Sequence, residues 1–203
     1  MKISIITATL NSGKTLEGTI LSVIGQTHKD IEYIIADGDS IDNTLEIVKK
    51  YSDKISKIIS GSDKGVYEAL NKGIKLANGD VIGFLHSNDI YYDNSVIETI
   101  ADEFEKSNAD CIWGDLLYTA EDNLRKIIRY WKSSEYRNGL FKTGWMPPHP
   151  TFFVKKEIYE KYGMFNLDFR IAADYELMFR FLKKYKIKSK YVPKIFIRMR
   201  VGG

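Results

Sequence analysis

In the first half of the chain, segments with the residue pattern of β-strands alternate with segments whose apolar residues recur at helical spacing. Short runs rich in β-branched residues, typical of strands, cover residues 3–7, 32–36, 54–59 and 81–85. Each run is followed by a stretch with apolar residues at helical spacing, at 16–24, 42–51, 66–77 and 94–106. Four strand–helix repeats in succession predict an α/β fold, with a mostly parallel open sheet and helices on both faces.

The second half of the chain is less regular. We expect strands at 111–118 and 126–131, helices at 156–162 and 173–185, and a final extended stretch at 188–199. Residues 136–150 form a loop rich in glycine, proline and aromatic residues. A length of 203 residues with 44% hydrophobic and 28% charged residues suits one domain with a sizeable core.

Cysteine content and hydropathy predict a cytoplasmic protein. The one cysteine, Cys111, excludes a disulfide within the chain and fits a reducing compartment. The apolar N-terminal run is broken at residues 11–14, too early for a signal peptide. No run approaches the roughly 18 apolar residues of a membrane-spanning helix.

The net charge of +3 combines two unlike segments. Residues 183–203 hold eight Lys or Arg and no acid, whereas residues 1–182 hold 22 basic and 27 acidic groups, a net charge of −5. A basic segment of this kind suits an anionic surface, either phospholipid or nucleic acid, and equally a solvated edge strand kept soluble by lysine. The body carries no basic stripe interleaved with aromatic residues, which disfavours nucleic acid.

One apparent nucleotide motif fails on inspection. Residues 8–15 follow a strand, open a helix and nearly match the phosphate-binding loop G-x-x-x-x-G-K-[ST]. Ala8 stands where that loop needs its first glycine, so the motif disfavours a nucleotide phosphotransferase.

Three carboxylates follow predicted strands directly. Asp37, Asp63 and Asp89 come after the second, third and fourth strands, whose carboxyl ends meet at one edge of a parallel sheet. Carboxylates close together raise one another's pKa unless a cation lies among them, so this pattern predicts a divalent ion, Mg²⁺ or Mn²⁺. The alternative is that Asp37 and Asp63 only cap turns or helices.

A series of motifs along almost the whole chain resembles family 2 glycosyltransferases. The motifs include Thr7-Ala8-Thr9-Leu10-Asn11, Asp37-Gly38-Asp39-Ser40, Asp63-Lys64-Gly65, Ala69-Leu70-Asn71, Ser87-Asn88-Asp89, His149-Pro150 and Asp174-Tyr175-Glu176-Leu177. The resemblance implies a single GT-A domain over residues 1–203, with 1–90 as the nucleotide-binding half and 91–203 as the acceptor-binding half. It further implies an inverting, metal-dependent transfer of a sugar, most simply from a UDP-sugar, to a saccharide or lipid-linked acceptor in cell-surface polysaccharide synthesis.

The resemblance also assigns roles to individual residues. Asp174 corresponds to the catalytic base, Asp89 to the ligand of Mn²⁺ or Mg²⁺, and Trp145 and His149 lie where an acceptor would bind. The positions implied for the nucleotide-sugar are Thr7, Ala8, Asp37, Asp39, Asp63, Lys64, Asn71, Asn88 and Arg180. Within that set, Lys64 is the cation expected at the diphosphate.

Two further expectations accompany the resemblance. A lipid-linked acceptor would place the enzyme at the inner face of the membrane, held there by the basic C-terminal segment. The triplet Ser87-Asn88-Asp89 lacks the leading carboxylate of the family's Asp-x-Asp motif, which leaves a non-catalytic nucleotide-sugar-binding module as the alternative function.

Overall fold

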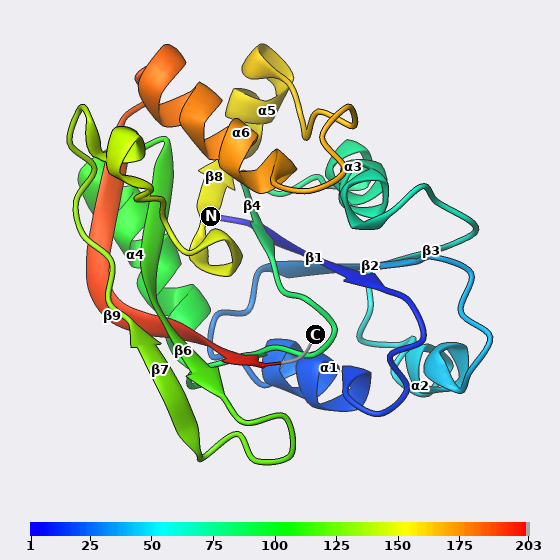
Figure 1. The fold of residues 1–203 in the computed structure, drawn as a ribbon. Helices are drawn as coiled ribbons and strands as arrows, with labels where there is room; N and C mark the ends of the chain where they lie inside the picture. Colours follow the sequence, from blue (N-terminus) through cyan, green and yellow to red (C-terminus); the bar gives the residue numbers. More distant parts are fainter. Residues whose placement is uncertain (202–203) are drawn as a thin grey trace.

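The structure is a computed structural model that describes residues 1–201. Its N-terminal half is a parallel sheet, as predicted, with the strand order β3–β2–β1–β4. These strands are β1 (Ile3–Thr9), β2 (Ile31–Asp37), β3 (Lys57–Ser60) and β4 (Val81–Phe84). Because all four run in one direction, their carboxyl ends meet at one edge of the sheet (Figure 1).

The second half continues the same sheet with mixed directions. Beyond β4, the order runs β8–β6–β9–β5, with β7 on the open part of β6. These strands are β5 (Ile90–Tyr91), β6 (Cys111–Thr119), β7 (Ile127–Trp131), β8 (Phe153–Lys155) and β9 (Ser189–Arg200). Only the pair β6–β9 is parallel in this half, so the strictly parallel region ends at β4.

Helices cover both faces of the sheet, because successive strand residues point to opposite sides. Ile5 of β1 packs in the core formed with α1 (Leu16–Ile24), α2 (Thr44–Lys50) and α4 (Val96–Ser107). Its neighbour Ile6 packs in the opposite core. That core is built with α3 (Val66–Leu76), α5 (Lys156–Tyr162) and α6 (Ala173–Phe179), and α6 continues as a π-helical turn, Arg180–Lys184. Figure 1 shows α3, α5 and α6 on one side of the sheet and α1 and α2 on the other.

The basic C-terminal segment is not a free tail. Its residues up to Arg200 include β9, which pairs with β6 on one side and with β5 on the other. Because β5 pairs with only Ile197 and Arg198, the first part of β9, where Lys190 and Lys194 lie, keeps an open edge on that side, as the edge-strand interpretation expects. Residues 202–203 lie outside the described part of the chain. Within residues 1–201, no helix has the length and apolar composition needed to cross a membrane.

Candidate functional site

A cleft of about 680 Å³ opens at the carboxyl ends of β1 and β4. Its walls come from the end of β1, the start of α3, the loop after β4 and the end of β9. The lining includes Ala8, Thr9, Asp63, Gly65, His86, Ser87, Asn88, Asp89, Tyr118, His149 and Arg200. Five of the residues predicted to bind a nucleotide-sugar, its metal or its acceptor thus lie around one cavity: Ala8, Asp63, Asn88, Asp89 and His149.

Strand β1 ends at Thr9, two residues further than predicted. As a result, the threonine of this strand that reaches the cleft is Thr9 and not Thr7. Thr7 is fully buried, and its hydroxyl hydrogen-bonds the Tyr33 hydroxyl at 3.1 Å. Thr7 is therefore part of the core and not of the cleft. Thr9 lies on the same face of the strand but reaches the cleft, and its Oγ1 has no hydrogen-bond partner among residues 1–201.

Asp37 organises the loop after β2. Its carboxylate accepts hydrogen bonds from the backbone N–H of Asp39 and of Ser40, and from the hydroxyls of Ser40 and Ser60. Four donors hold the side chain, which is 3% exposed. The backbone of Asp39 consequently takes a left-handed turn, with φ at 70°, and its side chain is exposed. Neither residue is among those that line the cleft.

Asp63 lies close to this loop, beside Gly38. A Cβ on Gly38 would come within 2.9 Å of Asp63 Oδ2, so a larger residue there would require the Asp63 side chain to move. Asp63 Oδ1 accepts a hydrogen bond from Gly65 N–H, just before α3. Lys64, between them, is exposed and does not line the cleft, which leaves the predicted diphosphate cation outside the cavity.

Asp89 lies at the cleft as a buried carboxylate without partners. Its side chain is fully buried, and neither carboxylate oxygen has a hydrogen-bond partner in the described chain. Burial raises the pKa of Asp89 to about 8, against the opposing effect of nearby Arg200. An orphaned carboxylate facing a cavity fits a hard divalent cation, whose charge would offset the cost of burying the anion.

The cation is not shared by the three carboxylates that the sequence pattern suggested. In residues 1–201, no three His, Cys, Asp or Glu side chains come close enough to hold a metal ion. Asp37 and Asp63 bond instead to the backbone of their own loops, the turn-capping role that was the alternative. A divalent ion at this site would have Asp89 as its protein ligand and would depend on ligand oxygens for the rest.

Arg200, at the end of β9, is a cleft residue that the sequence analysis missed. It is the one Lys or Arg among the residues that line the cleft, and its guanidinium donates to the backbone carbonyl of Asn88. Asn88 and Arg200 are 112 positions apart, and the pairing of β9 with β5 brings them together. The cluster of Lys and Arg after residue 182 is the feature of the sequence that points to such a cation, but the sequence does not show which of these residues reaches the cleft.

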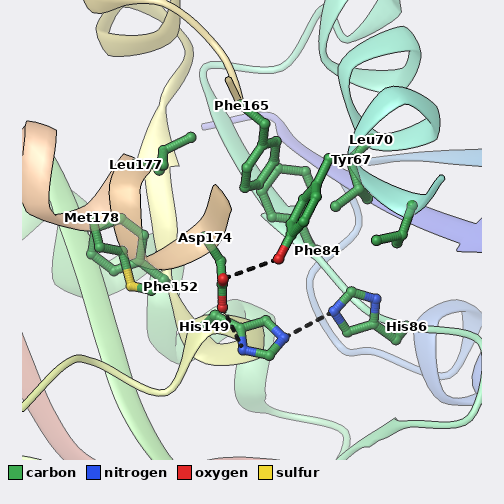
Figure 2. Close-up of a pocket in the computed structure, with 11 residues that line it drawn as sticks. Tyr67, Leu70, Phe84, His86, His149, Phe152, Phe165, Asp174, Leu177 and Met178 are labelled. Atoms are coloured by element: carbon green, nitrogen blue, oxygen red, sulfur yellow. Dashed lines mark hydrogen bonds and ion pairs between the residues drawn. The ribbon is translucent and has the colours of Figure 1, made fainter. Parts of the chain in front are cut away.

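Asp174 lies between Tyr67 and His149 beside the cleft, and His149 in turn contacts His86 (Figure 2). The Tyr67 hydroxyl donates to Asp174 Oδ1 at 3.0 Å, and His149 Nδ1 lies 3.2 Å from Oδ2. The other nitrogen of His149, Nε2, lies 3.2 Å from His86 Nε2. Burial lowers the pKa of His149 and lowers that of His86 to about 3, so both imidazoles are neutral at pH 7.

Neutral imidazoles fix the direction of these contacts. With its proton on Nδ1, which lies 3.2 Å from Asp174 Oδ2, a neutral His149 leaves Nε2 to accept from His86. The Tyr67 hydrogen bond and the His149 contact hold the Asp174 carboxylate in one orientation. A carboxylate held in this way, with a side chain 19% exposed, can act as a general base towards a bound hydroxyl.

Three other predicted residues point away from both cavities. All five N–H groups of Arg180 are engaged by Glu176 and by the carbonyls of residues 162–164, which leaves none for a diphosphate. Asn71 is buried and exchanges two hydrogen bonds with the backbone of Phe165. Trp145 packs against Trp113, Tyr136 and Phe141. For Arg180 and Asn71, a nucleotide-binding role is replaced by a structural one.

Asp174 and Asp89 line adjoining spaces. Val66, His86 and His149 line the cleft and also a smaller pocket of about 100 Å³ that has Asp174 in its wall. The site thus combines a cationic group, an unpartnered carboxylate and an oriented carboxylate around two adjoining cavities. This arrangement suits the transfer of a group from an anionic leaving group to a hydroxyl.

Comparison with known proteins gives concordant matches. The model of the family "Glycosyl transferase family 2" matches residues 4–163. A PGL/p-HBAD biosynthesis glycosyltransferase of Mycobacterium bovis is 28% identical over 93% of the chain and 73% of its own length. An uncharacterised glycosyltransferase of Mycobacterium tuberculosis is 30% identical over 88% of the chain and 68% of its length.

Two solved structures share the fold. S. aureus TarS in complex with UDP-GlcNAc matches the whole chain with a TM-score of 0.78 and 18% identity. The mannosyltransferase PcManGT from Pyrobaculum calidifontis, in complex with GDP-Man and Mn²⁺, matches 96% of the chain with a TM-score of 0.72 and 13% identity. The chain spans 59% and 56% of these two proteins, respectively. The predicted GT-A fold is confirmed.

Proposed function

The chain belongs to glycosyl transferase family 2, and from this premise we propose that it is an inverting enzyme that moves a sugar from a UDP-sugar to a hydroxyl. The acceptor is a saccharide or lipid-linked saccharide in the synthesis of a cell-surface polysaccharide. The bacterial relative that acts in PGL/p-HBAD biosynthesis and the TarS complex with UDP-GlcNAc support these two assignments.

One observation carries the proposal. The unpartnered carboxylate of Asp89 and the oriented carboxylate of Asp174 lie around adjoining cavities, which share His86 and His149 in their walls. A donor diphosphate at Asp89 and an acceptor hydroxyl at Asp174 would then meet in one space. Had the two carboxylates faced separate surfaces, no single bound sugar could connect them.

In this proposal, a positively charged side chain binds the diphosphate of the donor. Arg200 replaces Lys64 as the cation at the diphosphate, because Arg200 lines the cleft and a guanidinium can donate two parallel hydrogen bonds to phosphate oxygens. Asp63, Asn88 and the backbone at Ala8 contribute the polar surface around the donor. Asp37 acts indirectly by shaping the loop that ends beside the nucleoside.

A divalent cation fits the proposal at Asp89. Bound there, Mn²⁺ or Mg²⁺ would neutralise the diphosphate as negative charge builds on its leaving oxygen. The Mn²⁺ in the complex of PcManGT supports this choice for a protein of the same fold.

Asp174 is the base in this proposal. As the acceptor oxygen bonds to C1 of the sugar, its proton passes to Asp174, and the electron pair of the breaking C1–O bond goes to the diphosphate. Attack from the face opposite the leaving group inverts the configuration at C1. Tyr67 and His149 hold the carboxylate in position for this step.

The experiment measures binding and turnover separately. UDP should raise the melting temperature more with Mn²⁺ than with EDTA, and a UDP-sugar should be consumed in the presence of acceptor. Asp174→Asn should keep UDP binding and lose transfer. If the chain binds UDP but turns over no UDP-sugar, and Asp174→Asn changes nothing, the protein is the non-catalytic nucleotide-sugar-binding module that the weak Ser87-Asn88-Asp89 triplet suggests.

Membrane association belongs to the same proposal. Of the eight cations after residue 182, four are exposed and their ammonium groups bond no acidic group in the described chain: Lys184, Lys186, Lys188 and Lys194. These lysines would attract the enzyme to anionic lipids at the inner face of the membrane, where a lipid-linked acceptor is found.

A further inference from the structure

The small pocket beside Asp174 is apolar in its depth. Its volume is about 100 Å³, and its floor is formed by side chains from α3, β4, α6 and the loop before α6. These side chains are Tyr67, Leu70, Phe84, Phe165, Leu177 and Met178. Figure 2 shows Leu177, Met178 and Phe152 on one side of the Asp174 carboxylate, Tyr67, Phe165 and Leu70 on the other, and the two imidazoles below it.

The polar atoms at the mouth of this pocket are already bonded to one another. Asp174 Oδ1 accepts a hydrogen bond from the Tyr67 hydroxyl, Oδ2 lies 3.2 Å from His149 Nδ1, and His149 Nε2 lies 3.2 Å from His86 Nε2. A hydroxyl group that entered the depth of the pocket would therefore lose its water without gaining a partner there. An apolar group loses no hydrogen bonds to water when it enters the pocket, and it gains contact with the aromatic rings.

The size of the pocket limits what can occupy it. An apolar protein cavity of about 150 Å³ takes up benzene, so roughly 100 Å³ suits a methyl group or a slightly larger hydrocarbon group. Tyr67 and Phe165, whose ring centroids are 5.3 Å apart, offer faces on which such a group packs. A complete sugar ring does not fit, so the pocket receives one substituent of a larger ligand.

We propose that this pocket is an acceptor subsite for an apolar, carbon-linked group next to the reacting hydroxyl, such as the methyl group of a 6-deoxyhexose. The inference rests on the proposed function, because it takes Asp174 as the base. A base must lie within hydrogen-bond distance of the hydroxyl that it deprotonates. Groups on the neighbouring carbon atoms of the acceptor then fall into the cavity whose wall Asp174 forms.

The test compares matched sugars by ligand-observed NMR titration with the UDP-bound protein. The two pairs are methyl α-L-rhamnoside with methyl α-L-mannoside, and methyl α-D-fucoside with methyl α-D-galactoside. In each pair, one sugar has a methyl group where the other has a hydroxymethyl group. We expect the deoxy sugar of at least one pair to bind roughly 10- to 100-fold more tightly, with the strongest saturation transfer at its C6 methyl protons. Equal affinity within both pairs, or no binding of any of the four, overturns the subsite.

A filling variant ties the preference to the pocket. Leu177→Phe adds volume at the floor and should abolish the preference for the deoxy sugar. Leu21→Phe, on the exposed face of α1, makes the same change away from the pocket and should preserve the preference. If Leu177→Phe does not fold, Val66→Phe tests the same prediction at the 45%-exposed rim of the pocket. A preference that survives in the filled variant contradicts the assignment.

Failure of the subsite is distinguishable from failure of the proposed function. A protein that binds UDP and consumes a UDP-sugar, but does not discriminate within the pairs, refutes the subsite alone. A protein that shows no thermal shift with UDP refutes the proposed function, whatever the pocket binds.

Discussion

His149 Nδ1 lies 3.2 Å from Asp174 Oδ2, and this contact sets the orientation of the proposed base. His149 comes from the short 3₁₀ turn His149–Thr151, whereas Asp174 is in the first turn of α6. The Tyr67 hydroxyl bonds the other oxygen, so the carboxylate is held from two elements of the fold. An oriented carboxylate loses less freedom when the acceptor hydroxyl arrives.

We predict that His149→Asn preserves activity, whereas His149→Gln does not. Asn places its N–H₂ near the position of Nδ1 and can still donate to Asp174, whereas Gln mimics Nε2 and bonds only towards His86. His149→Ala and His149→Gln should lower kcat about 10- to 100-fold, while His149→Asn retains most of it. Steady-state kinetics with saturating UDP-sugar measure the difference. Equal losses in Asn and Gln variants would show that the contact with Asp174 has no part in catalysis.

A second prediction concerns Asp89 and the metal. Because burial without a hydrogen-bond partner raises the pKa of Asp89 to about 8, the metal-free protein carries an unfavourable buried charge above that pH, and Asp89→Asn removes it. We therefore expect the variant to melt at a higher temperature than the wild type in EDTA above pH 8, yet to lose the Mn²⁺-dependent gain in UDP affinity. Calorimetric titration of UDP with and without Mn²⁺ measures that gain. A variant that keeps the full effect of Mn²⁺ would place the ion elsewhere.

Arg200 is the cation that the donor should need. Arg200→Gln removes the charge from the cleft and should weaken UDP binding roughly tenfold or more, with a smaller loss in Arg200→Lys, which keeps the charge but not the planar fork. Arg198→Gln is the matched control. Arg198 belongs to the same strand but lies over the Tyr92 ring, outside the cleft. Equal UDP affinity in wild type and Arg200→Gln would remove Arg200 from the donor site.

The sequence predicts those elements of the fold that carry their own pattern. Every α-helix among the described residues, and each strand there of four or more residues, lies within a few residues of its predicted range. β5 and β8, with two and three residues, have no periodicity of their own, because they are strands only through their pairing with β9 and with β4 and β6. Their absence from the prediction reflects non-local structure.

The site follows the same rule. Asp89 and Asp174, which the resemblance to family 2 glycosyltransferases singles out, lie in the walls of the cleft and of the adjoining pocket. The resemblance singles out Thr7, but β1 runs on to Thr9, which pairs with Asp37 and reaches the cleft, and a strand end set by such pairing is not visible in the sequence. Arg200 and His86 gain their roles only through contacts with residues more than sixty positions away, which a pattern along the chain does not contain.

The exposed lysines near the C-terminus should bind anionic membranes. We expect the protein to float with liposomes that contain anionic lipid, and to lose most of that flotation when Lys184, Lys186, Lys188 and Lys194 are changed to Gln. Each lysine near such a surface contributes about 1 kcal/mol of attraction. The control carries Gln at four exposed lysines elsewhere: Lys29, Lys49, Lys75 and Lys142. Flotation that is equal in both variants, or absent in the wild type, contradicts membrane association through this segment.

Glu32 makes the stability of the fold depend on pH in the acidic range. Its side chain is 3% exposed and accepts from the Ser4 hydroxyl and the Asn78 backbone, and its Oε1 lies 2.9 Å from Lys57 Nζ. Burial opposes the charged form, but the Asn78 and Ser4 hydrogen bonds and the Lys57 ammonium outweigh it and lower the pKa of Glu32 from 4.5 to about 2. The stabilisation, about 3 kcal/mol, is fully present above pH 4.5 and is lost as the pH falls towards 2.

We therefore predict that Glu32→Gln unfolds at lower urea concentration than the wild type at pH 7, and that the difference between the two proteins shrinks as the pH falls from 4.5 towards 2. The amide cannot pair with the Lys57 ammonium, and it turns a donor group towards the Asn78 N–H or the lysine. Glu46→Gln, at an exposed position of α2, should match the wild type at every pH. Urea titrations at pH 7, 4.5, 3.5 and 2.5 measure the trend. A difference that stays constant over this range would mean that the Glu32 charge does not stabilise the fold.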